Sequence, residues 1–202
     1  MKILIIGTPR SGTSTLNLGL GKCLNIEIIG EPFNFSIPNR THKDLYRTGK
    51  PVLPDNCVLK TIIGQLPIEK HNTPWDEFYD EFISYFDKLI FLSRKDKHKM
   101  LESFAFAVDS GFWHDKWSKT YDINYKEYEK MLLGHSNYLL ELAKRNNKEV
   151  FWYEDLYSDN EQTIKLILNK WDIPGLTYED LYQYINTKNK YRQDDNFNKR
   201  LI

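Results

Sequence analysis

Apolar and polar positions divide the chain into short apolar runs and longer stretches in which apolar residues recur at helical spacing. Five runs rich in branched residues have the pattern of buried strands: 3–6, 26–30, 58–64, 88–93 and 149–153. The segments between or after these runs have helical spacing: 16–24, 75–86, 97–108, 125–145, a helix from 158 or 159 to 171, and 178–186. This alternation predicts an α/β protein with three layers, in which helices flank a mainly parallel sheet.

The remaining segments are expected to be connections. The polar stretch 36–56 contains three prolines and predicts a loop with at most a short helix, a length typical of substrate lids. Residues 65–75 form another predicted loop, 110–124 an aromatic loop, and 188–202 a basic tail. We find no internal repeat and no sign of a second domain, so the sequence predicts one domain over residues 1–202.

The connection after the first predicted strand has the composition of an anion-binding loop. Gly7 and Gly12 flank the sequence Thr-Pro-Arg-Ser, and hydroxyl residues then open the first helix. Backbone N–H groups of such a loop, the helix dipole and the hydroxyls together favour a bound anion. A glycine-containing turn of the kind found in any α/β protein is the alternative interpretation.

The spacing from Gly7 to Gly12 matches the first part of the Walker A pattern G-x-x-x-x-G-K-[ST]. Thr13 stands where that pattern has its lysine, which bridges the β- and γ-phosphates of a nucleoside triphosphate. The sequence therefore favours a phosphate or sulfate cradle containing the cation Arg10 over ATP or GTP hydrolysis.

Charged residues follow or interrupt the later predicted strands. Glu31 comes just after the second strand, and Lys60 interrupts the apolar third strand. A lysine in such a strand is expected to have an anionic partner or ligand. The basic run 94–99 follows the fourth strand, at the edge where α/β proteins bind ligands, and predicts a second anion site. The alternatives are a solvated turn carboxylate and a solvated charged face.

Composition narrows the function classes. Lys plus Arg and Asp plus Glu each number 28, so the formal net charge is zero and we expect no nucleic-acid partner bound through bulk charge. Only two cysteines occur, which predicts no disulfide framework and a reducing compartment. No signal peptide and no membrane-spanning apolar run is visible, so we expect a cytoplasmic protein without a membrane partner.

Four segments, taken in order, resemble sulfotransferases that use 3′-phosphoadenylyl sulfate (PAPS). The loop 8–14 resembles the family's 5′-phosphosulfate loop, and 31–33 resembles the acidic strand end of its carbohydrate and tyrosylprotein branches. The stretch 91–96 with Ser103 resembles the 3′-phosphate site, and 152–156 resembles a late Tyr-Glu-Asp-Leu segment. The short chain is similar to bacterial or viral relatives.

The resemblance implies a P-loop NTPase-like sulfotransferase fold and transfer of a sulfuryl group from PAPS to a hydroxyl of a carbohydrate, a tyrosine or another small molecule. It implies Glu31 as general base, with Arg10 and Lys60 assisting. The product would be 3′-phosphoadenosine 5′-phosphate (PAP), and no metal is expected. The implied nucleotide-binding residues are Pro9, Arg10, Ser11, Gly12, Thr13, Ser14, Thr15, Arg94, Lys95, Ser103, Tyr153 and Arg192.

The sequence also departs from the family pattern. Lys95 occupies the place of the family's arginine, with Arg94 one residue earlier, so either residue is a candidate for the 3′-phosphate. Ile62 follows Lys60-Thr61 where the cytosolic branch has its catalytic histidine, which favours Glu31 as the base. Two other functions remain open: a P-loop kinase that uses Arg10 in place of its lysine, and a nucleotide- or glycan-binding module without catalysis. Acceptor identity and oligomeric state are also open.

Overall fold

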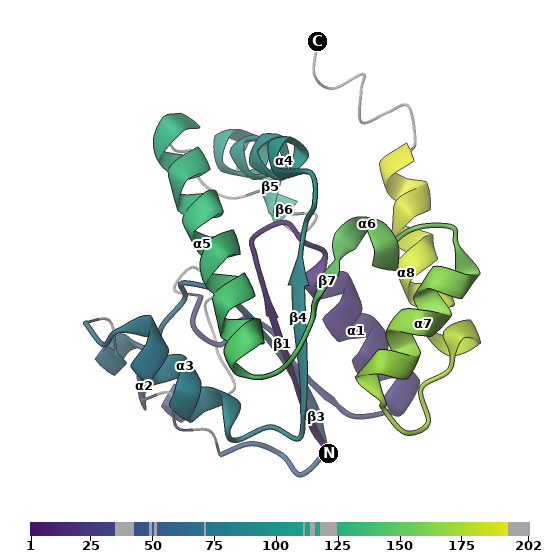
Figure 1. The fold of residues 1–202 in the computed structure, drawn as a ribbon, viewed down its shortest axis with the longest axis horizontal. Coiled ribbons are helices and arrows are strands. Elements are labelled where there is room, and N and C mark those ends of the chain that lie inside the picture. The colour runs from purple at the N-terminus through teal and green to yellow at the C-terminus, as the bar shows by residue number, and fades with distance from the viewer. Residues whose placement is uncertain are drawn as a thin grey trace.

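The computed structural model describes residues 1–34, 43–48, 50, 52–70, 72–110, 112–113, 116–117 and 125–193. Its centre is a five-stranded sheet in which every pairing is parallel. The strands are β1 (Lys2–Gly7), β2 (Glu27–Ile29), β3 (Cys57–Ile62), β4 (Lys88–Ser93) and β7 (Val150–Trp152), in the order β2-β3-β1-β4-β7 (Figure 1). The predicted α/β class and parallel sheet are confirmed.

Helices lie between and after the strands. Their bounds are α1 Thr13–Leu24, α2 Lys43–Thr48, α3 Trp75–Ile83, α4 Lys97–Ser110, α5 Tyr125–Arg145, α6 Tyr153–Leu156, α7 Glu161–Trp171 and α8 Tyr178–Gln193, with a 3₁₀ turn at Ile68–Lys70. A separate antiparallel pair joins β5 (Phe112–Trp113) to β6 (Lys116–Trp117). No helix in the described part of the chain combines the length and apolarity that crossing a membrane requires.

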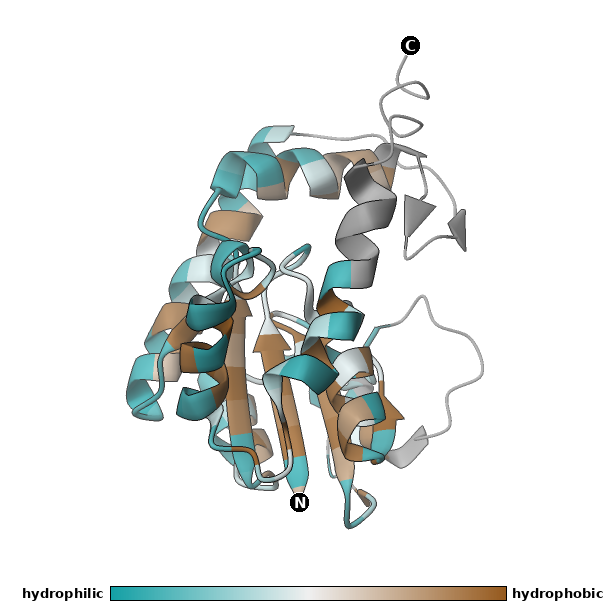
Figure 2. Ribbon diagram, turned by 90° about the vertical axis from the view of Figure 1, so that its right-hand side faces the viewer, coloured by the Kyte–Doolittle hydropathy of each residue, from teal (hydrophilic) through white to brown (hydrophobic). Residues whose placement is uncertain are grey.

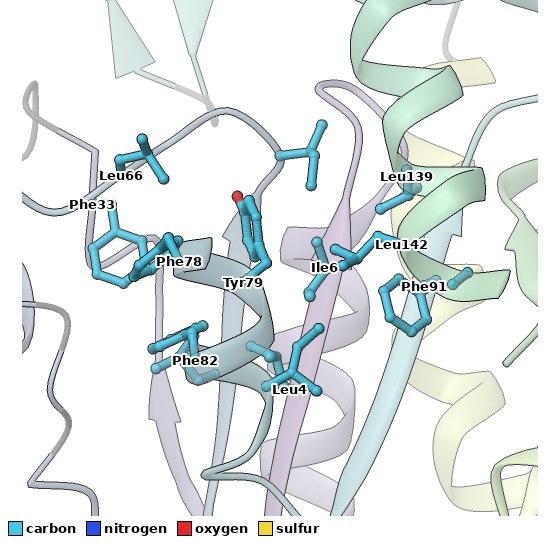
Figure 3. Packing of buried hydrophobic residues seen from close by; sticks show 14 of the residues in the cluster. Leu4, Ile6, Phe33, Leu66, Phe78, Tyr79, Phe82, Phe91, Leu139 and Leu142 are labelled. Atoms are coloured by element: carbon cyan, nitrogen blue, oxygen red, sulfur yellow. The ribbon is translucent and has the colours of Figure 1, made fainter. Parts of the chain in front are cut away.

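The two faces of the sheet pack against different helices because side chains alternate along a strand. Leu4 and Ile6 of β1 belong to a core cluster with residues of α3 and α5, which Figure 3 shows. Ile3 and Ile5 belong to a second cluster with residues of α1, α7 and α8. The strands are accordingly apolar along most of their length (Figure 2), and helices cover both faces.

The chain leaves the two central strands in opposite directions. After β1 it continues through α1 to the edge strand β2, and after β4 it continues through α4 and α5 to the other edge strand β7. The adjacent carboxyl ends of β1 and β4 therefore form a topological switch point, the place where open α/β sheets bind ligands. Gly7 of β1 is aligned with Leu92 of β4 there.

Two predicted ends near the last strand were wrong. The strand predicted over 149–153 ends at Trp152, because Tyr153 already starts the single-turn helix α6. The following helix begins at Glu161, two or three residues later than predicted. Asn160 is its N-cap and its side chain accepts a hydrogen bond from the Thr163 N–H, which satisfies one donor of the first turn.

Other differences concern helix length and the loops. Helix α8 was predicted to end at residue 186 but extends to Gln193, so part of the predicted basic tail is helical. The predicted aromatic loop 110–124 contains β5 and β6, which are too short for period-two alternation to reveal. The short helix allowed within 36–56 is α2, and the described residues of that segment are 43–48, 50 and 52–56.

Candidate functional site

The β1–α1 loop, residues 8–12, lies at the switch point and is held tightly to the strands. The Thr8 N–H donates to the Leu92 carbonyl of β4 (3.1 Å), and the Ser11 hydroxyl donates to the Thr8 carbonyl (2.7 Å). Arg10 and Gly12 have left-handed φ angles of 62° and 83°. The Ser11 hydroxyl thus stabilises the loop from within, where the sequence had predicted a ligand contact.

Both glycines of the loop are needed for its shape. A Cβ atom on Gly7 would lie 2.3 Å from the Thr13 methyl carbon, and one on Gly12 would lie 2.6 Å from the Tyr157 ring. The Tyr157 hydroxyl also donates to the Gly12 carbonyl (2.6 Å), and its ring stacks on Tyr153 at 4.6 Å. The loop is therefore clamped from the α6 side, and Tyr153 supports it.

Helix α1 begins directly after this loop with the three hydroxyl residues 13–15. Its N-cap is Gly12, which has no side chain to cap the helix, and its first turn has no acidic residue. The first N–H groups of a helix have no intrahelical acceptor, and the macrodipole places partial positive charge there. The N-terminus of α1 thus favours a bound anion. The predicted nucleotide-binding residues of the loop and first turn lie at this helix end: Pro9, Arg10, Thr13, Ser14 and Thr15.

A buried ion pair lies beside the start of α1. The Lys60 ammonium on β3 is 2.5 Å from Glu31 Oε1 and donates to the Ser14 hydroxyl, also at 2.5 Å. Both charged side chains are less than one-tenth exposed. The anionic partner predicted for Lys60 is confirmed, and Glu31 is a buried residue of the site, not a solvated turn residue.

Amide side chains complete the surroundings of Glu31. Its second oxygen, Oε2, accepts hydrogen bonds from Asn34 Nδ2 (2.7 Å) and Gln65 Nε2 (3.3 Å). Asn34 follows the predicted motif 31–33, and Gln65 lies in the loop after β3. Three donors from separate segments therefore hold this carboxylate, which fixes its orientation and lowers the cost of its burial.

The structure brings Arg10 and Ser103 together. Arg10 Nε donates to the Ser103 hydroxyl on α4 at 3.0 Å, although 93 residues separate them in sequence. The cation of the β1–α1 loop therefore reaches the helix on which the resemblance predicted a 3′-phosphate ligand. Arg10 and Ser103 thus connect the predicted 5′-phosphosulfate loop to the predicted 3′-phosphate site.

Arg94 and Lys95 are engaged by carboxylates that follow β7. Lys95 Nζ is 2.6 Å from Asp155, and Arg94 Nε is 3.5 Å from Glu154 while its guanidinium lies 4.8 Å from the Tyr153 ring centroid. Glu154 also accepts from the backbone N–H of Lys95 at 2.8 Å. The two predicted 3′-phosphate residues thus join β4 to α6 in this structure, and neither contacts Ser103 in the manner of Arg10.

Lys97 is a further cation of the site, which the sequence placed in the basic run 94–99 without distinguishing it from its neighbours. The Lys97 ammonium donates to the Ser93 hydroxyl (3.1 Å) and to the Arg94 carbonyl (2.5 Å). Ser93 in turn lies 3.2 Å, oxygen to oxygen, from the Thr8 hydroxyl. The available signal was its spacing, since Lys97 comes four residues after the serine that ends an apolar strand.

Metal ligands do not gather here. Within the described ranges no group of three or more His, Cys, Asp or Glu side chains is placed to hold a metal ion. The hydroxyl of Ser14, which occupies the Ser/Thr place of the Walker pattern, already accepts from an ammonium. Arg192 lies in the last turn of α8, and its side chain is outside the described residues.

No protein-family model matches this chain, and no curated protein matches it in sequence. The arrangement therefore carries the functional argument: an anion-binding helix start, a loop arginine, and a buried carboxylate–ammonium pair. Such a set can bind a phosphate or sulfate ester, accept a proton and stabilise negative charge on a leaving oxygen.

Proposed function

We propose that this protein is a PAPS-dependent sulfotransferase that moves a sulfuryl group to a hydroxyl acceptor. The observation that carries the proposal is the Lys60–Glu31 pair, which contacts Ser14 at the first turn of α1. A carboxylate and a cation at the end of an anion-binding loop are what proton removal and charge stabilisation require. The ordered resemblance of four sequence segments supports the same assignment.

The residues present fit the donor nucleotide. The β1–α1 loop is bounded by Gly7 and Gly12, and because these glycines lack a Cβ atom, Thr13 and the rings of Tyr153 and Tyr157 can pack directly against the loop and fix its shape. No acidic side chain occupies the first turn of α1. Arg10 and Ser103 supply a cation and a hydroxyl between this loop and α4. PAPS would therefore be held by the loop, the first turn of α1, and these two side chains.

Each residue then has a chemical task. PAPS supplies an activated sulfuryl group. Glu31 accepts the proton of the acceptor hydroxyl, and a positioned base of this kind contributes about 10²–10⁴ in rate. Lys60 and Arg10 place positive charge where the leaving phosphate oxygen gains negative charge. Asn34 and Gln65 hold the Glu31 carboxylate in position.

A magnesium-dependent kinase fits less well. The Ser14 hydroxyl would have to coordinate Mg²⁺ beside the Lys60 ammonium, which repels a cation and already donates to that oxygen. Strand β4 ends in Leu92-Ser93 without an aspartate that would hold the metal. ATP with Mg²⁺ is nevertheless an arm of the test.

The experiment is a thermal-shift titration of the purified chain with PAP, AMP, adenosine 3′,5′-cyclic phosphate and ATP–Mg²⁺. A ligand of the folded state alone raises stability by about 2.7 kcal/mol at a hundredfold excess over Kd. We expect a selective rise of Tm with PAP. A rise with ATP–Mg²⁺ alone, or with none of the four, would reject the proposal. PAP formation from PAPS with a panel of sugar and phenol acceptors then tests turnover.

A further inference from the structure

The basic segment 94–99 contains side chains that form ion pairs with carboxylates and one cation, Lys97, that differs from them. Four of its side chains lie within 4 Å of a carboxylate: Arg94 of Glu154, Lys95 of Asp155, His98 of Glu102 and Lys99 of Asp96. Among the residues that the structure describes, Lys97 has no carboxylate within that distance. The segment therefore contains one cation whose charge is not balanced by an ion pair.

The Lys97 side chain folds back over the end of β4. Its ammonium donates to the Ser93 hydroxyl and the Arg94 carbonyl, both neutral acceptors, and lies 5.5 Å from the centroid of the Trp152 ring. Burial lowers the pKa of this ammonium, whereas the charge of Glu154 acts in the opposite direction. Removing a cation from water without a partnered anion is costly, so the position favours an anionic ligand.

The nearby Glu154 does not supply that anion, because other groups already occupy its oxygens. Glu154 Oε2 accepts from the Lys95 N–H at 2.8 Å, and Oε1 accepts from the Asp96 N–H at 3.2 Å and lies 3.5 Å from Arg94 Nε. Its carboxylate therefore closes the turn after β4. Arg94 and Lys95 are tied into the same turn through Glu154 and Asp155.

Hydroxyl groups link Lys97 to the β1–α1 loop. Its hydrogen-bond partner Ser93 is almost fully buried and lies 3.2 Å, oxygen to oxygen, from Thr8, the first residue of that loop. The series Thr8, Ser93, Lys97 thus crosses from β1 to β4 at the switch point. An anion at Lys97 would lie at the same sheet edge as one held by α1.

We propose that Lys97, and not Arg94 or Lys95, supplies the cation that binds the second phosphate of a nucleotide in this site. The ligand class is a phosphate monoester, which in the proposed reaction is the 3′-phosphate of PAPS and PAP. The inference rests on the proposed function for the nucleotide's identity. The binding of a phosphate or sulfate group by Lys97 rests on the geometry alone.

The experiment compares Kd for PAP and AMP by calorimetry in Lys97→Gln, Lys97→Arg, Lys95→Gln and Lys99→Gln. AMP lacks the 3′-phosphate, so the ratio of the two Kd values reports that group and not the general integrity of the fold. We expect Lys97→Gln to weaken PAP about 10- to 100-fold and to leave AMP within about threefold, the range for a hydrogen bond to a charged group. Lys97→Arg is expected to retain the preference for PAP. Lys99 is exposed and paired with Asp96, so Lys99→Gln is expected to leave that preference unchanged.

A preference for PAP that survives in Lys97→Gln, or that is lost in Lys95→Gln instead, overturns the inference. If the unsubstituted chain binds no nucleotide, the proposed function fails and inorganic sulfate becomes the probe. Sulfate then has to raise the Tm of the unsubstituted chain and of Lys95→Gln but not of Lys97→Gln. An equal rise in all three, or no rise in the unsubstituted chain, rejects an anion site at Lys97.

Discussion

At the scale of single residues, the buried Lys60–Glu31 pair bears on both stability and chemistry. Both side chains are buried, and their charges are compensated by each other and by Ser14, Asn34 and Gln65. A buried ion pair contributes little net stability compared with apolar residues of the same volume. Removing one member alone is costly, because the remaining charge has no counter-ion.

We therefore expect Lys60→Met to lower the free energy of unfolding by about 3–5 kcal/mol, since it leaves the Glu31 carboxylate unpaired. The double variant Lys60→Met/Glu31→Gln is expected to regain at least half of that loss. Urea unfolding of the two single variants and the double variant measures the coupling between the two sites. Strictly additive effects would show that the pair is not coupled as its 2.5 Å separation indicates.

Glu31→Gln tests the chemical role of the same residue. The amide keeps the size of the side chain but cannot accept the acceptor's proton, so PAP formation from PAPS is expected to fall at least about a hundredfold. Binding of PAP, measured by calorimetry, is expected to stay within about threefold, a change of less than 1 kcal/mol. Near-normal turnover in this variant would remove Glu31 from the role of base.

At the scale of elements, the β1–α1 unit depends on a glycine at position 12. Its φ of 83° is left-handed, and a Cβ there would lie 2.6 Å from Tyr157 and 2.9 Å from Tyr153, two rings that are stacked on each other. A side chain at this position strains the backbone and also displaces the clamp from α6. The conformation of the loop and the packing of α6 are therefore determined together.

Gly12→Ala is expected to destabilise the protein by at least about 1–3 kcal/mol. The matched control is Gly134→Ala, because Gly134 lies within α5, and a Cβ there would have no atom within 4 Å. We expect that control to be stabilising by roughly 0.5–1 kcal/mol, the helix preference of alanine over glycine. Thermal unfolding of both variants is the measurement, and equal effects would contradict the strain at position 12.

The pattern of apolar residues predicted the existence of helices and strands better than it predicted where they end. All five strands of the parallel sheet lie where branched apolar runs indicated, because strands buried on both faces form near-continuous apolar runs, whereas β5 and β6 were not predicted. Tyr153 was assigned to a strand although it opens α6, since the aromatic residue suits either state. The length of α8 was underestimated because its last turns are polar and lack an apolar stripe.

The candidate site was predictable only where neighbouring residues define it. The loop 8–12 and the need of Lys60 for a partner follow from local sequence, and the structure gives that partner as Glu31. The pairing of Lys95 with Asp155 depends on β4 lying beside β7, a strand order that no local pattern contains. The same strand order pairs Arg94 with Glu154, whereas the partners of His98 and Lys99 lie three or four residues away in the sequence.

At the scale of the whole molecule, stability is expected to depend on pH through a histidine of α5 that packs against the start of α3 and the loop after β3. His135 on α5 lies against Trp75, with ring centroids 5.4 Å apart, and against the backbone at Gly64, whose added Cβ would be 2.8 Å from Nε2. Its Nδ1 atom is buried without a hydrogen-bond partner in the described structure. Burial therefore lowers the pKa of His135 from 6.5 to about 4.

The sign of the effect follows from linkage. The unfolded chain binds a proton on this histidine near pH 6.5, whereas the folded chain resists doing so until about pH 4. The stability associated with neutral His135 is fully present above pH 6.5 and is lost progressively as the pH falls toward 4. Between pH 7 and pH 5 this amounts to about 2 kcal/mol.

Urea unfolding at pH 7, 6 and 5 of the unsubstituted chain, His135→Gln and His98→Gln tests this expectation. Carboxylates are expected to contribute similarly in all three proteins. Asp76, which follows Trp75 in the sequence, has a pKa lowered by its hydrogen bond from Tyr138. The difference from His135→Gln therefore isolates the imidazole, and it should grow to about 2 kcal/mol at pH 5. His98, whose side chain is 81% exposed, should give a variant that follows the unsubstituted chain. Parallel curves for His135→Gln and the unsubstituted chain would mean that the imidazole can be protonated without cost, and that α5 moves away from Trp75 to let water reach it.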